Sequence, residues 1–233
     1  MKRSLLLLFL SFLSTSTIGF GQSSEITFEF IGNCGLHLTD GSTDLYIDFP
    51  YKSGAFNYME FDESELDSIK ENSYFVFTHK HADHYSRKSL RSTLKKKKGA
   101  AFGVWNISKL AQLQDSFGDF EIEAFKTKHS FFGIPFRHYS YLITWHGIRI
   151  FLSGDTTNPE TIGTIEDIDW AFVPYWILKS AREQEINIDA SMSFVYHLYP
   201  SQIKSAEEAF AEKETIHPLT VQGEKHSISF SKP

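Results

Sequence analysis

The sequence predicts a single mixed α/β domain, and three observations lead to this prediction. Short apolar stretches with the alternation of β-strands are interspersed with polar stretches of helical character along the chain. The chain has 233 residues and a hydrophobic content of 41%, which is enough for a sizeable core in one domain. It contains no internal repeat, low-complexity tract or Pro/Gly-rich linker that would mark a domain boundary.

Residues 1–21 are typical of a secretory signal peptide. Lys2 and Arg3 precede an apolar run over residues 5–13, and small residues lead to Gly21. The apolar run is too short to span a bilayer, which takes about 20 residues. We therefore expect residues 22–233 to form the domain, without a membrane span, after export to the periplasm or the extracellular space.

The first half of this domain is expected to begin with strands. Residues 25–31 alternate polar and apolar side chains, and a second strand at 44–49 follows the turn at Asp40-Gly41. A short helix at 63–71 leads to the apolar strand at 74–77. The polar stretch 86–98 is helical in character and ends at Gly99, which suits a helix C-terminus. A strand at 101–104 and a helix at 108–115 follow.

The second half continues the alternation. Residues 120–125 alternate again, and strands at 137–144 and 148–152 flank a turn at 145–147, which predicts a hairpin. Buried strands are expected at 170–173 and 194–196, and a helix at 202–213. The tail from Ile216 is expected to add an edge strand at 226–230, without an assigned function.

The strongest functional feature follows the strand at 74–77. The next residues are Thr78-His79-Lys80-His81-Ala82-Asp83-His84. Residues two apart in an extended segment point to the same side, so His79 and His81 can bind one metal ion. Asp83 and His84 come after a change of direction and can bind a second. Imidazole nitrogen and carboxylate oxygen favour Zn²⁺, with Mn²⁺ or Fe²⁺ as alternatives, over Ca²⁺ and Mg²⁺.

Three more residues of ligand type follow other predicted strands. His129 comes after the strand at 120–125, Asp155 after 148–152 and His197 after 194–196. Gly154 allows the backbone to turn sharply before Asp155. Singly, each is a common loop residue. Together with the cluster at 79–84 they place every strong candidate ligand at the end of a strand, so we expect them to converge. The other five histidines (His37, His138, His146, His217 and His226) are expected to be ordinary strand, turn or tail residues.

This order of motifs resembles the metallo-β-lactamase superfamily. The motifs are His79-x-His81-x-Asp83-His84, His129, Gly154-Asp155 and His197, and the likeness covers essentially the whole domain. The segment 194–200 looks most like the branch of hydrolases related to ascorbate-6-phosphate lactonase. The resemblance implies a four-layer αββα sandwich, with two facing sheets, helices outside and the metals at one edge.

The resemblance also implies individual roles. One divalent ion would be held by His79, His81 and His129, the other by Asp83, His84 and His197, with Asp155 bridging them. Asp48 would support the site from behind the ligands. Many members of the branch carry Gly-His near the first strand, where this chain has Gly32-Asn33-Cys34-Gly35. That His is not a metal ligand in the family, so the metal site is unaffected, but any substrate contact it makes has no obvious counterpart here.

The expected function follows from these ligand types. Two divalent ions would lower the pKa of a bound water to about 7, so that a metal-bound hydroxide attacks the substrate, and would polarise its carbonyl or phosphoryl oxygen. Asp83 is the expected catalytic residue, because it would both hold the second metal and handle the proton. We expect an exported hydrolase of a small-molecule or lipid ester, with a lactone-like or phosphodiester-like bond.

Several alternatives stay open: true β-lactamase or thioesterase activity, a di-iron redox enzyme, and a non-catalytic metal-binding protein of the same fold. β-Lactamases of the superfamily usually have Cys, or lack the bridging Asp, at the position of Asp155. Redox members usually carry a carboxylate in place of one His and an attached flavin domain. The net charge of −6 argues against a nucleic-acid partner. Near the ligand-bearing loops, Phe131, Phe132, Tyr175 and Trp176 are candidate substrate contacts.

Overall fold

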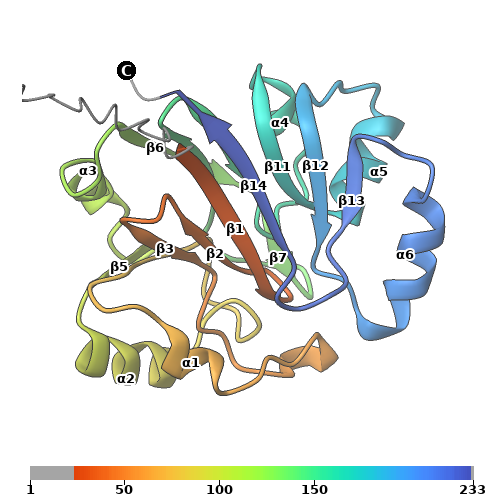
Figure 1. Ribbon diagram of the computed structural model, residues 1–233. Helices are drawn as coiled ribbons and strands as arrows, with labels where there is room; N and C mark the ends of the chain where they lie inside the picture. The colour runs from red at the N-terminus through yellow and green to blue at the C-terminus, as the bar shows by residue number, and fades with distance from the viewer. Residues whose placement is uncertain (1–23, 232–233) are drawn as a thin grey trace, which may run out of the picture.

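The computed structural model describes residues 24–231, and these form two six-stranded β-sheets that face each other with helices on their outer sides (Figure 1). The predicted four-layer αββα sandwich is therefore confirmed. The expected signal peptide, residues 1–21, lies outside the described residues. Within the described part of the chain, no helix has the length and apolar character needed to cross a membrane.

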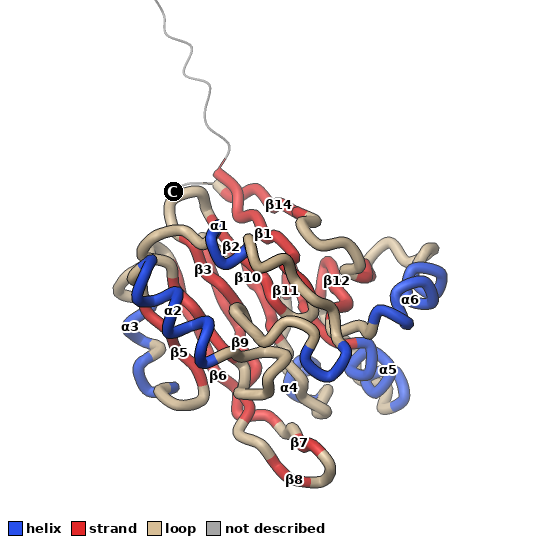
Figure 2. The backbone as a smooth tube through the Cα atoms, turned by 90° about the horizontal axis from the view of Figure 1, so that it is seen from below, coloured by secondary structure: helices blue, strands red, loops and turns tan. Residues whose placement is uncertain are grey.

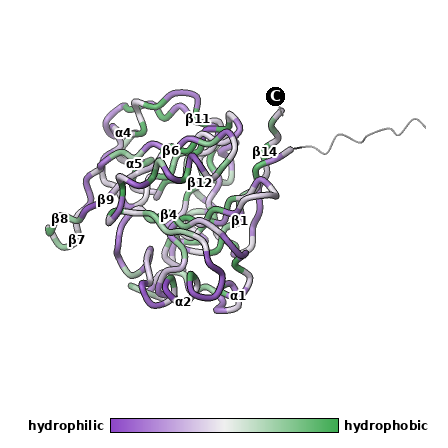
Figure 3. Tube along the Cα trace, turned by 90° about the vertical axis from the view of Figure 1, so that its left-hand side faces the viewer, coloured by the Kyte–Doolittle hydropathy of each residue, from purple (hydrophilic) through white to green (hydrophobic). Residues whose placement is uncertain are grey.

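The first sheet has the strand order β14-β1-β2-β3-β4-β5. Its strands β3, β4 and β5 are parallel, and the other neighbours are antiparallel. Helices α1 (Glu65–Ser68) and α2 (Arg87–Lys97) cover its outer face, where Leu90 of α2 packs in a cluster with Phe75 and Phe77. The trace of α2 is largely hydrophilic in colour, in keeping with the many polar residues on its exposed faces (Figure 3). The strands are β1 (Ser24–Gly32), β2 (Gly35–Thr39), β3 (Asp44–Ile47), β4 (Tyr74–Phe77), β5 (Ala100–Gly103) and β14 (Lys225–Phe230).

The second sheet has the order β13-β12-β11-β10-β9-β6. Strands β10 to β13 are parallel, whereas β9 is antiparallel to both of its neighbours. Its helices pack outside: Ile162 of α4 and Ile177 of α5 lie in one cluster, and Ala206 of α6 packs in another. The strands are β6 (Phe120–Thr127), β9 (His138–Trp145), β10 (Ile148–Leu152), β11 (Ile168–Pro174), β12 (Ala190–Tyr196) and β13 (Ile216–Pro218), and the helices are α4 (Glu160–Gly163), α5 (Tyr175–Glu183) and α6 (Ile203–Phe210).

Smaller elements complete the structure. The strands β7 (Ser130–Phe131) and β8 (Ile134–Pro135) form a hairpin that extends away from the two sheets (Figures 2 and 3). Helix α3 (Ala111–Gln114) buries Leu113 in the main core. Single 3-10 turns are found at Ala55–Asn57, Ile107–Lys109 and Pro200–Gln202.

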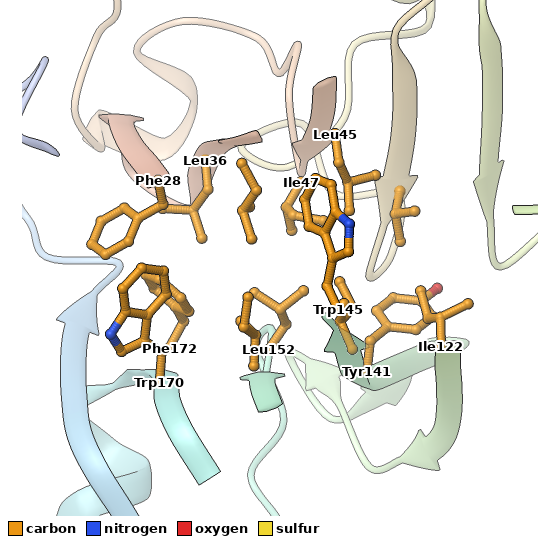
Figure 4. Packing of buried hydrophobic residues seen from close by; sticks show 14 of the residues in the cluster. Phe28, Leu36, Leu45, Ile47, Ile122, Tyr141, Trp145, Leu152, Trp170 and Phe172 are labelled. Carbon is orange, nitrogen blue, oxygen red and sulfur yellow. The ribbon is translucent and has the colours of Figure 1, made fainter. Parts of the chain in front are cut away.

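The core lies between the sheets and is rich in aromatic side chains (Figure 4). In β1 every second residue is buried, so that Ile26, Phe28 and Phe30 point inward. The Phe28 ring meets Trp170 and Phe172 of the opposite sheet edge-on, at centroid distances of 5.1 and 4.8 Å. Such pairs hold the two sheets in a fixed relative position, and thereby fix the loops at their edges.

Most strands were predicted from the sequence, but the predicted bounds of several helices differ from those in the structure. The strand at 74–77 and the hairpin of β9 and β10 are confirmed, and the expected edge strand is β14, which pairs with β1. The helices expected at 63–71, 108–115 and 202–213 are shorter than predicted. Strands β2, β7, β8 and β13 and helices α4 and α5 were not predicted. Helix α5 directly follows Pro174 and has no side-chain cap, so its start lacks the Ser, Thr, Asp or Asn that usually marks a helix N-terminus.

Candidate metal centre

All seven predicted ligands meet at one edge of the sandwich, at the lower side of Figure 1 where β12 ends. One group follows β4 of the first sheet, and the other three residues follow strands β6, β10 and β12 of the second. Each side chain is buried or half-buried. The residues brought together are His79, His81, Asp83, His84, His129, Asp155 and His197.

A first ligand set consists of His79, His81, His129 and Asp155, whose ligand atoms all lie within 4.8 Å of one another. The His129 Nε2 atom is 3.1 Å from His81 Nδ1, and His79 Nε2 is 3.8 Å from Asp155 Oδ2. The His129 Nδ1–H group donates to the Asp155 carbonyl oxygen at 2.9 Å. This contact leaves Nε2 of a neutral His129 ring without a proton, as metal binding requires.

A second ligand set surrounds His84 and His197. Their Nε2 atoms are 3.1 Å apart, and they lie 3.0 and 3.2 Å from Asp155 Oδ1. The His197 Nε2 atom is also 3.2 Å from Asp83 Oδ2. Zinc–ligand bonds of 2.0–2.1 Å in a tetrahedron place ligand atoms about 3.3 Å apart. The spacing in this set therefore fits a single divalent ion. Because Asp155 turns Oδ2 to the first set and Oδ1 to the second, it has the bridging position that the resemblance implies.

Buried atoms without hydrogen bonds give a second test of the fit. His79 Nε2 and Asp83 Oδ1 are both buried and make no hydrogen bond to any described residue. Leaving such a group unsatisfied costs about 1–3 kcal/mol, whereas a divalent cation next to it would satisfy it. The donor set of imidazole nitrogen and carboxylate oxygen is that of a transition-metal or zinc site. The residues present therefore fit a pair of divalent ions.

Electrostatics differ between the two sets. Burial lowers the pKa values of His79, His81 and His129, which keeps the first set in the neutral form that binds metal. Burial also opposes protonation of His84 and His197, but the surrounding carboxylates, foremost that of Asp155, together outweigh it and raise both pKa values, that of His197 to about 8. A metal ion bound in the second set must therefore displace protons, so its binding weakens as the pH falls.

Asp48 makes the contacts expected of a residue that supports the ligands. Its carboxylate accepts hydrogen bonds from Thr78 N–H and Thr78 Oγ1–H, both at 2.7 Å, and from His84 Nδ1–H at 2.8 Å. The side chain is fully buried directly after β3. Asp48 therefore fixes both the loop that follows β4 and the ring of His84, whose Nε2 is left facing the second set.

His138 has a structural role at the site that the sequence analysis did not assign. The expectation that it is an ordinary strand residue is wrong, because its ring lies behind Asp155. Its Nε2 accepts from the Asp155 N–H at 2.9 Å, so Nδ1 carries the proton and donates to Thr127 Oγ1 at 2.7 Å. The only sign of this role in the sequence is that His138 itself is a polar residue at an inward-facing position of a strand.

Cys34 is a second residue that the sequence analysis left without a role. Its sulfur lies with ligand atoms of His84, Asp155 and His197 in one group within 4.8 Å. Burial raises the pKa of the thiol well above its usual value, so it is protonated at neutral pH in the structure as described. The neighbouring Asn33 donates from its side-chain Nδ2 to the Asp83 carbonyl at 2.8 Å, and its backbone carbonyl accepts from the His197 N–H at 3.1 Å. The turn between β1 and β2 therefore forms the back wall of the second set.

A cavity of about 430 Å³ opens in front of the ligands. Aromatic side chains form much of its wall: Tyr58 stacks on Tyr199 with ring centroids 4.1 Å apart and meets His197 edge-on at 4.1 Å. Trp176 donates from Nε1 to the Thr156 carbonyl at 2.9 Å, which fixes its ring in the wall. The lining residues are Phe56, Tyr58, His81, Asp83, His129, Ser130, Asp155, Thr157, Trp176, Ser180, His197 and Tyr199.

The four aromatic residues proposed as substrate contacts have different positions. Trp176 lines the cavity, as expected. Tyr175 does not: it is 48% exposed and packs against Phe210 of α6. Phe132 lies at the tip of the β7–β8 hairpin and is 90% exposed, and the side chain of Phe131 lies outside the described part of the structure.

Comparison with known proteins identifies the fold. No protein-family model and no curated protein matches the sequence. Among solved structures, a protein from Parabacteroides distasonis described as a metal-dependent hydrolase is 21% identical, with a TM-score of 0.60 over 84% of this chain and 92% of that chain. Igni18, a metallo hydrolase from Ignicoccus hospitalis, is 16% identical, with a TM-score of 0.61 over 89% of this chain and 100% of that chain. The di-iron β-hydroxylase CmlA from Streptomyces venezuelae is 14% identical, with a TM-score of 0.56 over 89% of this chain and 54% of that chain. At these identities the comparison establishes a shared fold.

Proposed function

We propose that this protein is an exported hydrolase of the metallo-β-lactamase fold that uses two divalent metal ions, most readily Zn²⁺, to cleave a small-molecule or lipid ester. The observation that carries the proposal is the position of Asp155. Its two carboxylate oxygens face different ligand sets, with Oδ1 3.0 Å from His84 Nε2 and Oδ2 3.8 Å from His79 Nε2. Such a shared carboxylate is the arrangement that holds two ions close together.

The comparisons support the reaction class. Two neighbours of the same fold are described as metal-dependent hydrolases, and a third is the isothiocyanate hydrolase from Delia radicum gut bacteria, at 13% identity and a TM-score of 0.60. Each of these hydrolyses would depend on the same chemistry, which divalent ions in the two ligand sets would supply. Divalent ions bound there supply Lewis acidity and activate water at neutral pH.

Residues of this chain would carry the remaining steps. Asp83 Oδ1 is buried and makes no hydrogen bond to any described residue, and the Asp83 side chain lines the cavity. It is placed to accept the proton of the attacking water and to return it to the leaving group. Burial raises the pKa of Tyr58, so its hydroxyl keeps its proton, and its ring lines the cavity beside His197.

The cavity suits a small substrate. Its volume of about 430 Å³ lies near the lower end of the range for small-molecule sites, about 300–1,000 Å³. Tyr58, Trp176 and Tyr199 offer apolar surface to the organic part of the substrate. Residues of both ligand sets line the same cavity. A lactone or a phosphodiester with an apolar substituent matches these features, and the net charge of −6 does not favour a nucleic acid.

A substrate panel on metal-loaded protein tests the proposal. Chromogenic lactones, phosphodiesters and β-lactams are offered, and we expect turnover of at least one ester class that is lost after chelation. Asp155→Ala should lose both bound metal and activity, whereas Asp44→Ala, at a carboxylate paired with His37, should keep them. A metal-loaded, fully active Asp155→Ala protein would contradict the assignment.

Oxidative chemistry is the second candidate, because the di-iron β-hydroxylase shares the fold. The three histidines of the first set weigh against it, since redox members usually carry a carboxylate in place of one of them. Elemental analysis and a visible spectrum of the purified protein separate the two functions. Bound iron with oxygen consumption would favour the redox enzyme, and zinc with ester cleavage would favour the hydrolase.

Export is tested separately. We expect the protein recovered from the periplasm or medium to begin at about residue 22, as N-terminal sequencing would show. Recovery of the full-length chain from the cytoplasm alone would contradict this part of the proposal.

A further inference from the structure

A separate group of ligand-type side chains lies where the outer strands of the two sheets approach each other. His217 is in β13, the edge strand of the second sheet, and His226 is in β14, the edge strand of the first. Glu224 directly precedes β14. None of these three residues belongs to the metal centre described above. One ligand atom from each of them lies within 4.8 Å of the others.

The two imidazole rings are aimed at the same carboxylate oxygen. His226 Nε2 is 2.7 Å from Glu224 Oε1, and His217 Nε2 contacts the same oxygen atom. The ring of His226 stacks on Phe28 at 5.1 Å and meets Phe194 edge-on at 4.8 Å, and His217 meets Phe194 at 5.9 Å. Because Phe28 and Phe194 are buried core residues, the imidazole rings rest on a rigid surface that directs both Nε2 atoms toward Glu224.

The group is also accessible to an ion in solution. The side chains of His217, Glu224 and His226 are 41%, 20% and 31% exposed. An ion can therefore enter without any rearrangement of the core, and water can complete its coordination. Two imidazole nitrogens, one carboxylate oxygen and a water molecule make up a tetrahedral ligand set typical of Zn²⁺.

We propose that His217, Glu224 and His226 form a further Zn²⁺ site, which joins the edge strands of the two sheets. Strands β13 and β14 belong to different sheets and are not paired with each other. An ion bound by both would cross-link the sandwich along this side. Since the folded strands hold the three side chains at this spacing, bound Zn²⁺ stabilises the native state. The sequence suggested no function for the tail from Ile216. With this site, the tail would act as a clamp that holds the edge strands of the two sheets together.

Other histidines of the chain show what an ordinary pair looks like. His37 Nε2 is 2.7 Å from Asp44 and its ring stacks on Tyr46 at 4.5 Å, and His146 Nε2 is 3.0 Å from Asp40. The His37 pair has one imidazole and one carboxylate. His146 has a second carboxylate, Asp119, but it lies 3.8 Å from the other ring nitrogen, Nδ1, so neither group places enough ligands around one point for a stable site. His37 is therefore a matched control for His217, with the same type of partner and a similar aromatic support.

The test counts zinc ions per chain by equilibrium dialysis followed by elemental analysis. We expect His217→Gln to bind one Zn²⁺ fewer than the wild type, and His37→Gln to bind as many as the wild type. Only the difference between variants is used, so the result does not depend on the occupancy of the metal centre or on its activity. Equal zinc counts in His217→Gln and the wild type would overturn the proposal.

A second variant separates metal binding from simple hydrogen bonding. Glu224→Gln retains an oxygen that accepts a hydrogen bond from a histidine but loses the negative charge. We expect added Zn²⁺ to slow amide hydrogen exchange in β13 and β14 of the wild type and to have at least tenfold less effect in Glu224→Gln. If Zn²⁺ protects these strands equally in both proteins, or in neither, the clamp does not exist.

Discussion

Asp48 and His138 are buried behind the metal centre and fix the orientation of the groups in front of them. Asp48 holds the ring of His84 at 2.8 Å, and His138 holds the backbone of Asp155 at 2.9 Å. Neither residue lines the cavity described above. Their effect on metal binding is therefore indirect: they set the tautomer and the direction of the ligands.

The first prediction concerns Asp48→Asn. One of the two carboxylate oxygens becomes an NH₂ group, so that either the hydrogen bond from Thr78 N–H at Oδ1, or those from Thr78 Oγ1–H and His84 Nδ1–H at Oδ2, can no longer be accepted. We expect the affinity for metal to fall about 10–100-fold. Competition titration with a chromogenic chelator measures it. Asp44→Asn, whose partner His37 is outside the metal centre, serves as the control, and equal affinities for the two variants would contradict the assignment.

The second prediction concerns the pH dependence of stability. Burial lowers the pKa of His138 to about 3, whereas an unfolded histidine titrates near pH 6.5. Between these values the unfolded chain binds a proton that the native chain does not. The contribution of His138 to the free energy of unfolding is therefore complete above about pH 6.5 and is lost progressively as the pH falls toward 3.

Denaturant titrations of the chelated protein at several pH values between 7 and 4 measure this slope. We expect His138→Gln to be less stable than the wild type at pH 7 but to lose stability less steeply on acidification. Parallel slopes for the two proteins would show that His138 is not a source of the acid sensitivity.

At the scale of elements, the strand ends determine where the chemistry occurs. Strand β10 ends before Gly154, which adopts a φ of 57° and turns the chain toward Asp155. A Cβ atom at this position would lie 2.5 Å from His138 Nε2 and 2.8 Å from Thr78 Cβ. Glycine is therefore required both by the backbone conformation and by the close packing of the loops that follow β4 and β10.

The third prediction is that Gly154→Ala loses metal binding as well as stability. Gly147 in the turn between β9 and β10 provides the control, because its φ of 81° imposes a similar backbone cost while a Cβ there meets nothing within 4 Å. We expect Gly147→Ala to lose about 1–2 kcal/mol of stability and to retain its metal content. Elemental analysis with thermal unfolding compares them. Normal metal content in Gly154→Ala would contradict this account.

The strands were predicted better than the helices for a physical reason. Strands β1 and β4 carry local patterns, since β1 alternates buried and exposed residues and β4 is a short apolar run. Helix α5 and strand β2 acquire their stability from packing against neighbours: Ile177 of α5 packs in a cluster with residues of the second sheet, and β2 pairs with both β1 and β3. Such tertiary contacts leave little trace in a local window of sequence.

At the scale of the whole molecule, the metal centre connects the two sheets. The loop after β4 belongs to the first sheet, and the loops bearing His129, Asp155 and His197 belong to the second. Each ligand set contains residues from the loops of both sheets. Metal binding and the face-to-face packing of the sheets are therefore thermodynamically linked.

The fourth prediction follows from this linkage. Chelation should lower the midpoint of thermal unfolding, and added Zn²⁺ should restore it. Leu45→Ala, which opens a cavity in the core between the sheets (Figure 4), should cost about 2–5 kcal/mol while leaving the metal content unchanged. Calorimetry with elemental analysis measures both quantities, and an unfolding midpoint that is insensitive to chelation would show that the metals do not join the sheets.

The sequence by itself determined the ligand types, their order and their location at strand ends, because these features depend on neighbouring residues and on local periodicity. It did not determine which atoms meet. His84 and His197 are 113 residues apart, and Asp155 is 17 residues from His138. Only the tertiary structure turned Asp155 toward both ligand sets and placed Cys34 and His138 behind them. Strand pairing and the stacking of two sheets bring distant residues into contact, and these interactions are not encoded in any short segment of the chain.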